Sequence, residues 1–275
     1  MRTTISAFFL VACGLGACAL VACGGAAAPD PLPCDAPASE GLTFGACPQS
    51  VLRLRPVARA GGAWIGGGLE GECSGSEAQV RCPSSAGELV LDRDGDAFTV
   101  SLIASGDVVV EALGAEGPAY VEGAGSWISN GFHSWSQSGA LAIGGAVADA
   151  QLMAAIAERG DTEVLRDGRE LSWSFTVIGG GGPVLLAGAT TAARLRPWAQ
   201  VSRAPEPAQE LLQVRIASGG VERVSVASGE TLESERFVVI AGGEAEPVLR
   251  DYASRLDVRE RAPAEVGWNS WYELW

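Results

Sequence analysis

Short runs in which apolar and polar residues alternate, each bounded by turn residues, most constrain the fold of this chain. The segment ELVLDRDGDAFTVSLIA, residues 88–104, holds two such runs joined at Asp94-Gly95. An Asp-Gly pair between two alternating runs is a strong signal for a β-hairpin. The segment VLRLRPV, residues 51–57, alternates apolar with charged residues, which predicts a strand with one face buried and the other in water.

The same pattern continues along most of the chain. Further strand-like segments, with glycine-rich turns between them, are DVVVEAL, ALAIGGAV, TEVLRDGRELSWSFTVIG, LLQVRIASGGVERVSVAS and RFVVIAG. One short helix is indicated among them, at residues 149–159. Many short strands with little helix predict an all-β domain, an antiparallel β-sandwich over residues 50–243.

The pattern changes near residue 244. Val248, Tyr252 and Leu256 fall at i, i+4 and i+8, which is the spacing of one apolar helix stripe. Pro247 falls in the first turn, where proline is tolerated. We therefore expect a linking helix within residues 244–262, followed by a new element at residues 263–275.

The N-terminus has the features of an export signal. Arg2 precedes a nearly uninterrupted apolar run, and small residues follow that run. The sequence LVACG, residues 20–24, resembles a bacterial lipoprotein cleavage box, in which the cysteine becomes lipidated. We predict that residues 1–22 are removed and that Cys23 anchors the protein at the outer membrane or cell surface. A membrane-spanning anchor is the alternative.

Four cysteines follow this signal, and an even number in an exported chain predicts two disulfides. Pairing between sequence neighbours is preferred among the three possible connectivities, namely Cys34 with Cys47 and Cys73 with Cys82. A zinc site is the competing interpretation, but the sequence has no C-x-x-C and contains a single histidine. Residues 23–49 are rich in Ala, Pro and Gly and are predicted to form a tether, rigid only within the first disulfide ring.

The formal net charge of −14 at pH 7 argues against a nucleic-acid partner, which requires a basic face. A neutral ligand such as a sugar suits an acidic surface better. The segment DRDGD, residues 92–96, lacks the spacing to a bidentate glutamate that a calcium loop requires, and we interpret it as a hairpin turn. The glycine runs at 66–68 and 179–182 match no nucleotide-binding motif, so no metal and no cofactor are predicted.

Five of the eight tryptophans lie in two short windows. The first, GSWISNGFHSWSQSG at residues 125–139, contains Trp127 and Trp135, and the second contains Trp268, Trp271 and Trp275. Flat aromatic faces beside Asn, His and Ser donors are suited to a sugar, because the ring stacks on the pyranose and the polar groups bind hydroxyls. The alternative is an aromatic cluster in the core of the sandwich.

Two motifs in these windows, NGFHSWS at residues 130–136 and GWNSWY at residues 267–272, resemble glycoside hydrolases of the α-galactosidase type, the melibiase and raffinose-synthase clan. EPVLRDYASRL, residues 246–256, resembles the helix that precedes the second motif in that family. The resemblance implies a β-supersandwich, a linking helix and then a (β/α)₈ barrel, so that residues 263–275 would be the first strand of an incomplete catalytic barrel.

The resemblance also implies roles for four residues. Trp135 corresponds to the sandwich tryptophan that walls the sugar site, and His133 stands where the family usually has glutamine. Trp271 and Tyr272 correspond to aromatics at the C-terminal end of the first barrel strand, where barrel active sites lie. The family's two catalytic aspartates come from later barrel strands, so no catalytic residue is assigned here and the chain alone is expected to be inactive.

The resemblance and the export signal together imply the N-terminal portion of an exported, lipid-anchored enzyme that hydrolyses terminal α-galactosides by a retaining mechanism. Its partners would be a carbohydrate, a membrane through the lipid and, because family members often assemble, further copies of itself. Two alternatives remain: a non-catalytic carbohydrate-binding surface lipoprotein, and a structural envelope lipoprotein whose tryptophans belong to the core.

Overall fold

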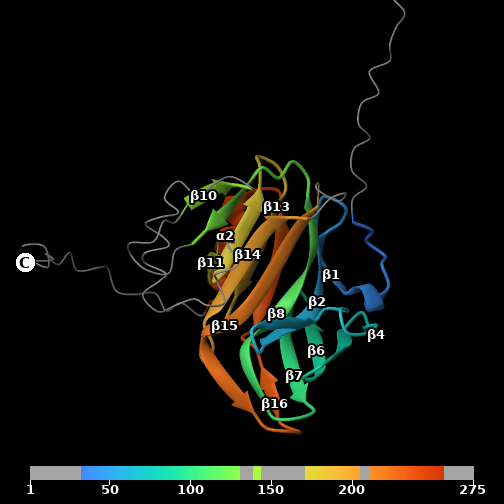
Figure 1. The fold of residues 1–275 in the computed structure, drawn as a ribbon. Helices are drawn as coiled ribbons and strands as arrows, with labels where there is room; N and C mark the ends of the chain where they lie inside the picture. The colour runs from blue at the N-terminus through green and yellow to red at the C-terminus, as the bar shows by residue number, and fades with distance from the viewer. Residues whose placement is uncertain (1–31, 131–138, 144–170, 205–210, 257–275) are drawn as a thin grey trace, which may run out of the picture. The chain divides into compact units, whose positions relative to one another are not determined.

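The computed structural model describes residues 32–130, 139–143, 171–204 and 211–256. These residues form two antiparallel β-sheets and one short α-helix, which confirms the all-β class predicted from sequence (Figure 1). The predicted helix at 149–159 and the start of the barrel at 263–275 lie outside the described residues.

In the described part of the chain, one sheet has seven strands in the order β1-β2-β8-β15-β14-β11, with β3 paired to β2. The bounds of its strands are β1 Leu42–Ala46, β2 Ser50–Ala60, β3 Ala63–Gly66, β8 Val108–Val121, β11 Leu171–Trp173, β14 Pro197–Arg203 and β15 Leu212–Val226.

The second sheet has ten strands within the described ranges, in the order β10-β9-β12-β13-β17-β7-β6-β5-β4, with β16 paired to β7. The bounds of its strands are β4 Ser74–Ser76, β5 Gln79–Ser84, β6 Gly87–Asp94, β7 Ala97–Ala104, β9 Ser126–Ser129, β10 Gly139–Ala142, β12 Phe175–Gly179, β13 Val184–Ala189, β16 Thr231–Glu233 and β17 Phe237–Gly242. A 3₁₀ helix, η1, spans Ala38–Glu40.

The predicted hairpin at Asp94-Gly95 is present. Strands β6 and β7 pair along their full lengths, and Gly95 has a φ of 65°, a conformation that glycine adopts without strain. The carboxylates of this turn are bound by other protein groups. Asp94 pairs with Arg236 at 2.6 Å and Asp96 pairs with Arg255 at 2.7 Å. The segment is therefore a structural turn, as predicted.

The main core lies between the two sheets. Its centre contains three phenylalanines, with Phe98 5.4 Å from both Phe44 and Phe237 between ring centroids. All three rings are 1% exposed or less. They come from β1, β7 and β17, so this cluster ties the first strand of one sheet to the middle of the other.

Strand β2 differs from the half-buried strand predicted for residues 51–57. Arg53 is 5% exposed, because its guanidinium pairs with Glu40 at 2.9 Å and donates to the carbonyl of Pro33 at 2.5 Å. Arg55 Nε donates to the carbonyl of Glu40 at 2.8 Å. The segment around η1 therefore covers the face of β2 that was expected to be in water.

The tether predicted over residues 23–49 is also wrong in its second half. Residues Leu42–Ala46 form β1, which pairs with β2 and buries Leu42 and Phe44. The alternation of Leu42 and Phe44 is a short strand signal that the surrounding Ala, Pro and Gly residues obscured. Disulfides join Cys34 to Cys47 and Cys73 to Cys82, which is the connectivity preferred from sequence.

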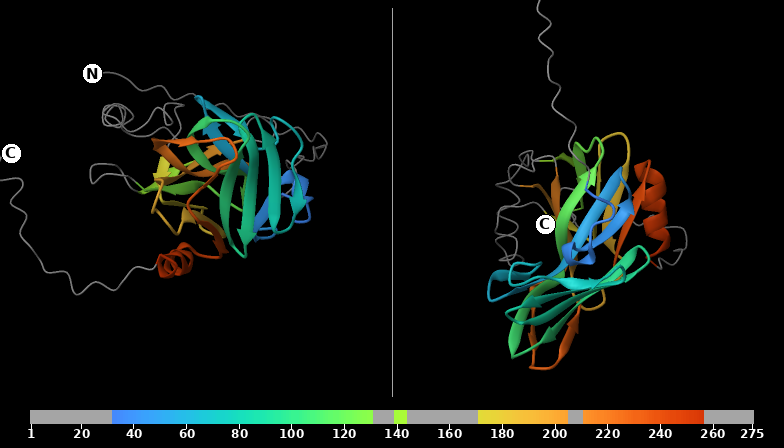
Figure 2. Two further views of the ribbon diagram at one scale, coloured as in Figure 1. Left: turned by 90° about the horizontal axis from the view of Figure 1, so that it is seen from below. Right: turned by 90° about the vertical axis from the view of Figure 1, so that its right-hand side faces the viewer.

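Helix α2, Ala245–Ser254, confirms that a helix lies within residues 244–262. Its buried residues, Val248 and Tyr252, pack on the outer face of the ten-stranded sheet with Leu186 and Ile240 (Figure 2). The described residues thus form three layers, two sheets and one helix. Within these same residues, no helix has the length and hydropathy of a membrane span.

Replacing Phe44 with Ala tests whether β1 belongs to the folded domain. We expect the free energy of unfolding to fall by about 3–5 kcal/mol, because the substitution leaves a cavity in the central aromatic cluster. Urea titration followed by fluorescence measures this loss. Leu69→Ala is the control, since Leu69 is 73% exposed, and should change the same quantity by less than about 0.5 kcal/mol. Equal small effects would mean that residues 42–46 are tether after all.

Candidate functional site

The sequence-predicted site residues Trp135, His133, Trp271 and Tyr272, and the lipidation residue Cys23, lie outside the described residues. The structure does describe the elements next to the two aromatic motifs. Strand β9 and Asn130 lead into residues 131–138, and β10, which pairs with β9, follows them. Helix α2 precedes the second motif. Both of these elements contact the same part of the fold.

That part is a crossover corner, residues 172–175, where the chain passes from one sheet to the other. Strand β11 belongs to the seven-stranded sheet and β12 to the ten-stranded sheet, and Ser174 alone separates them. Ser174 has a φ of 68°, the one positive φ at a non-glycine residue in the described ranges. Its N–H donates to the Pro197 carbonyl at 3.0 Å, and its carbonyl accepts from the Ala189 N–H at 2.8 Å. These bonds hold a conformation that non-glycine residues rarely adopt.

Asn130 is bound to this corner by three hydrogen bonds. Its N–H donates to Ser172 Oγ at 2.8 Å, and its side-chain amide donates to the Trp173 carbonyl at 2.9 Å. Its own carbonyl accepts from the Trp173 N–H at 2.8 Å. Ser172 Oγ in turn donates to the Phe175 carbonyl. The entry to residues 131–138 is therefore fixed to the corner by both backbone and side chain.

Two further bonds hold the rest of β9 to the strands on either side of the corner. Ser129 Oγ donates to the Leu171 carbonyl at 3.0 Å, and Thr176 Oγ1 donates to the Ile128 carbonyl at 2.9 Å. Leu171 lies in one sheet and Thr176 in the other. Strand β9 is thus attached to both sheets at the point where the predicted sugar-binding motif begins.

Helix α2 reaches the corner through Tyr252. Its hydroxyl donates to the Ala189 carbonyl at 2.6 Å, and its ring lies 5.3 Å from that of Phe175 between centroids. Gly188 permits this approach, because a Cβ there would lie 3.0 Å from the Tyr252 ring and 2.6 Å from Phe175 Cβ. Burial raises the pKa of Tyr252 to about 12, so the hydroxyl keeps its proton and its role as donor at neutral pH.

Arg255, directly after α2, fixes the helix end to the sheet. Its guanidinium pairs with Asp251 at 2.9 Å and with Asp96 of the β6–β7 turn at 2.7 Å. Hydrogen bonding to Asp251, and then to Asp96, raises the pKa of Arg255 despite its partial burial. The last described residues before the second motif are therefore held at both Tyr252 and Arg255.

The three tryptophans outside the two sequence windows gather on the outer face of the seven-stranded sheet. Trp198 is 1% exposed and donates through Nε1 to the Gly219 carbonyl at 3.0 Å. Trp64 lies edge-on to Trp198 at 6.1 Å, and Trp173 is opposite Trp198 in the β11–β14 register. No site was predicted at these residues, although the alternation of Trp198, Gln200 and Ser202 could have indicated one face of a strand.

Guanidinium groups lie over two of the three rings of this outer cluster, which consists of Trp64, Trp173 and Trp198. Arg215 lies 4.0 Å from the Trp64 centroid and is bound to Glu116, while Arg196 lies 5.8 Å from the Trp173 centroid. Such cation–π contacts stabilise the face but use the surface that a sugar would need for stacking. The outer cluster is therefore a packing layer behind the corner.

Glu235 is the one buried carboxylate among the described residues, with 2% of its surface exposed. Burial pushes its pKa upward. Hydrogen bonds from Thr191 Oγ1 and the backbone N–H groups of Leu195 and Arg194 outweigh that effect, so the pKa lies below the usual value. Glu235 is thus ionised at neutral pH with its lone pairs engaged. This is a structural role, unlike that of a catalytic acid, which needs a raised pKa.

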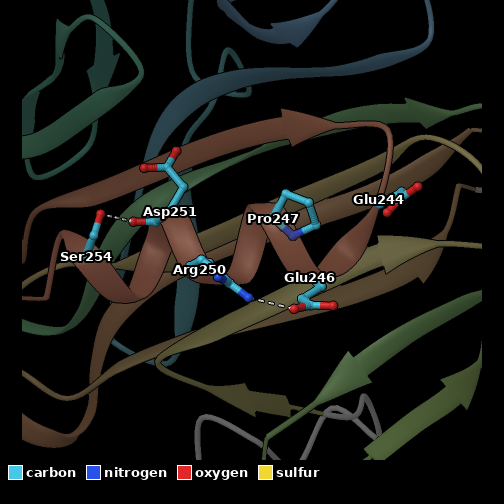
Figure 3. A pocket seen from close by; sticks show the side chains of 6 residues that line it. All are labelled: Glu244, Glu246, Pro247, Arg250, Asp251 and Ser254. Carbon is cyan, nitrogen blue, oxygen red and sulfur yellow. Dashed lines mark hydrogen bonds and ion pairs between the residues drawn. The ribbon is translucent and has the colours of Figure 1, made fainter.

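A hollow of about 590 Å³ lies beside the exposed side of α2. Its lining residues are Glu244, Glu246, Pro247, Arg250, Asp251 and Ser254 (Figure 3). Arg250 pairs with Glu246 at 2.7 Å along the helix. None of these described lining residues is aromatic, so this part of the structure is a poor fit for a pyranose ring. Within the described ranges, no three His, Cys, Asp or Glu side chains lie close enough to share a metal ion.

No protein-family model matches the chain, and no curated protein matches it. Among solved structures, it is similar to an α-galactosidase from Thermus thermophilus in complex with p-nitrophenyl α-D-galactopyranoside. The identity is 19% and the TM-score 0.35, over 68% of this chain and 33% of that chain.

Two further solved structures are similar to this chain. The galactosidase domain of an α-galactosidase-sucrose kinase has 12% identity and a TM-score of 0.40, over 74% of this chain and 29% of that chain. A GH36 α-galactosidase from Geobacillus stearothermophilus in complex with raffinose has 10% identity and a TM-score of 0.37, over 71% of this chain and 28% of that chain. The chain thus spans about a third or less of each of these proteins.

Tyr252→Phe tests the contact between α2 and the corner. At neutral pH we expect a loss of about 1–3 kcal/mol in the free energy of unfolding, because the buried Ala189 carbonyl loses its donor. In the native chain the tyrosine pKa is raised, so its contribution is complete below pH 10 and is lost as pH rises toward 12. The stability difference between the two proteins should therefore shrink over that interval, as measured by urea titration at each pH. A difference independent of pH would contradict the burial of the hydroxyl.

Glu235→Gln tests the engaged carboxylate. The folded-state pKa is lowered, so the carboxylate stabilises the protein above the ordinary value of 4.5, and that contribution is lost as pH falls further. We expect the variant to lose about 1.5–3 kcal/mol at neutral pH, the range for hydrogen bonds to a charged group, and progressively less in acid. Glu233→Gln is the control, since this half-exposed residue makes only a 3.9 Å ion pair. Equal losses in both variants would contradict the account.

Proposed function

We propose that this chain is the sandwich portion of an α-galactosidase-like glycoside hydrolase and that it contributes one wall of the sugar site. The resemblance of NGFHSWS and GWNSWY to that family supports the substrate class. In this proposal the substrate is a terminal α-galactoside, and the parent reaction is retaining hydrolysis by two carboxylates.

The observation that carries the proposal is the convergence at the crossover corner. Asn130, the first residue of NGFHSWS, is bound to Ser172 and Trp173. Tyr252, on the helix before GWNSWY, contacts Phe175. The described elements that precede two motifs more than 130 residues apart in sequence thus contact one four-residue corner. An aromatic cluster used only for packing would not require this arrangement.

The chemistry of each wall follows from the residue types. Trp135 would stack on the C–H face of the sugar, with His133 bonding a hydroxyl or supporting the segment. Trp271 and Tyr272 would form a second aromatic wall at the end of a barrel strand. The nucleophile and the acid/base would come from further barrel strands, so that the present chain binds a sugar without hydrolysing it.

We also propose that the protein is exported and anchored through a lipid on Cys23. The disulfide between Cys34 and Cys47 supports export, because structural disulfides persist in oxidising compartments. The covalent ring begins eleven residues after Cys23, so the tether in this proposal is shorter than residues 23–49 and ends before β1.

Calorimetric titration of the full chain with methyl α-D-galactopyranoside tests the function. We expect weak but measurable binding, and an affinity at least about tenfold lower in Trp135→Ala, since that factor corresponds to 1.4 kcal/mol of lost contact. Trp64→Ala is the matched control, because this tryptophan lies in the outer cluster with its ring under Arg215. It should lower stability and leave the affinity unchanged.

The outcomes separate the candidate functions. Binding that is lost in Trp64→Ala but kept in Trp135→Ala would move the sugar site to the outer cluster and contradict the proposal. Absence of binding to any sugar would favour a structural envelope lipoprotein. Binding through Trp135 in a native protein that never carries a barrel would identify a carbohydrate-binding lipoprotein without catalytic function.

A further inference from the structure

We propose that the crossover corner, residues 172–175, is a positioning element that holds the entry to residues 131–138 and the C-terminal end of α2 in one fixed relation. This inference rests on the proposed function for its ligand, a galactoside. It predicts that a substitution in α2 alters the environment of Trp135. It also predicts that a substitution at Asn130 alters the environment of α2.

The first step is that the contacts form one continuous path. Asn130 binds Ser172 and Trp173, and Ser174 follows at once in the chain. The Ser174 carbonyl accepts from the Ala189 N–H at 2.8 Å, and the Ala189 carbonyl accepts from the Tyr252 hydroxyl at 2.6 Å. The path from β9 to α2 thus runs through the backbone of three residues, Trp173, Ser174 and Ala189.

The second step is that the corner has little freedom to absorb a displacement. Ser174 is held at a φ of 68° by bonds to strands of both sheets, and Ser172 is 0% exposed. Phe175 is in contact with Tyr252 on one side, while its carbonyl accepts from Ser172 Oγ. A strained and fully bonded turn of this kind either keeps its geometry or opens as a unit.

The third step is that the hydrogen bonds of Asn130 to the corner come in addition to the pairing of β9 with its neighbouring strands. Strands β9 and β12 already share main-chain pairs at Ile178–Trp127 and Gly179–Ser126. The side chain of Asn130 adds a bond beyond the end of β9, at the first residue of the motif. A bond placed there fixes the direction in which the chain leaves β9.

The experiment uses the full chain labelled with 5-fluorotryptophan and observed by ¹⁹F NMR. The Trp135 resonance is assigned by its absence in Trp135→Phe. Three variants break the path at different points: Asn130→Ala, Ser172→Ala and Tyr252→Phe. Two matched controls leave it intact. Ser126→Ala removes a similar bond, to the Gly179 carbonyl at 3.1 Å, from the far end of β9. Arg250→Ala changes an exposed residue of the same helix as Tyr252.

We expect the three path variants to shift or broaden the Trp135 resonance and the two controls to leave it unchanged. Affinity for methyl α-D-galactopyranoside should fall at least about fivefold in Asn130→Ala and Ser172→Ala, the factor that one ordinary hydrogen bond represents. Tyr252→Phe is decisive, because it breaks the described path at its helix end, at the bond to Ala189. In the Asn130→Ala, Tyr252→Phe double variant, the change in the Trp135 resonance should differ from the sum of the changes in the two single variants.

Two results would overturn the inference. One is a Trp135 resonance unchanged by both Asn130→Ala and Tyr252→Phe while both proteins remain folded. The other is an equal shift in the Ser126→Ala control, which would indicate general loosening of β9. Failure of the proposed function is distinguishable, since the resonance would then respond to the path variants as expected while Trp135→Ala leaves sugar affinity unchanged.

Discussion

The hydrogen bonds around Ser174 are the interaction on which the rest of the arrangement depends. A single residue carries the chain from the seven-stranded to the ten-stranded sheet, in a backbone conformation that costs free energy for any residue with a Cβ. It persists because Pro197 and Ala189, one from each sheet, bind its peptide groups. With the crossover fixed, β9 and α2 have a common surface to dock on.

The layers on either side stabilise this corner in different ways. Behind it, the outer cluster packs against guanidinium groups on the face of the seven-stranded sheet, with Trp198 buried and Trp64 and Trp173 partly buried. On the other side Tyr252 combines an apolar ring with a buried donor, so α2 docks by both packing and a hydrogen bond. Glu235, bound by the N–H groups of Arg194 and Leu195, fixes the connection between β13 and β14.

Local sequence patterns predicted most of the described fold. The Asp94-Gly95 hairpin, the helix stripe of Val248 and Tyr252, and the pairing of cysteines close in sequence each depend on neighbours along the chain, and all three are present. The wrong predictions concern residues whose contacts are distant in sequence. Arg53 was expected in water, but Glu40 and Pro33 cover it, and Phe44 was assigned to a tether because its core partners, Phe98 and Phe237, come later in the chain. The corner could not be foreseen, since nothing in the sequence around Ser174 indicates a positive φ or a change of sheet.

Native-state hydrogen exchange of the corner amides tests the central claim most directly. The N–H groups of Trp173, Ser174 and Ala189 are donors within one connected set of bonds. If the corner is a single unit, these three amides exchange with the same opening free energy, and Tyr252→Phe lowers all three by the same amount. If the Trp173 N–H exchanges independently of the Ala189 N–H and does not respond to Tyr252→Phe, then β9 and α2 are anchored separately and the account is wrong.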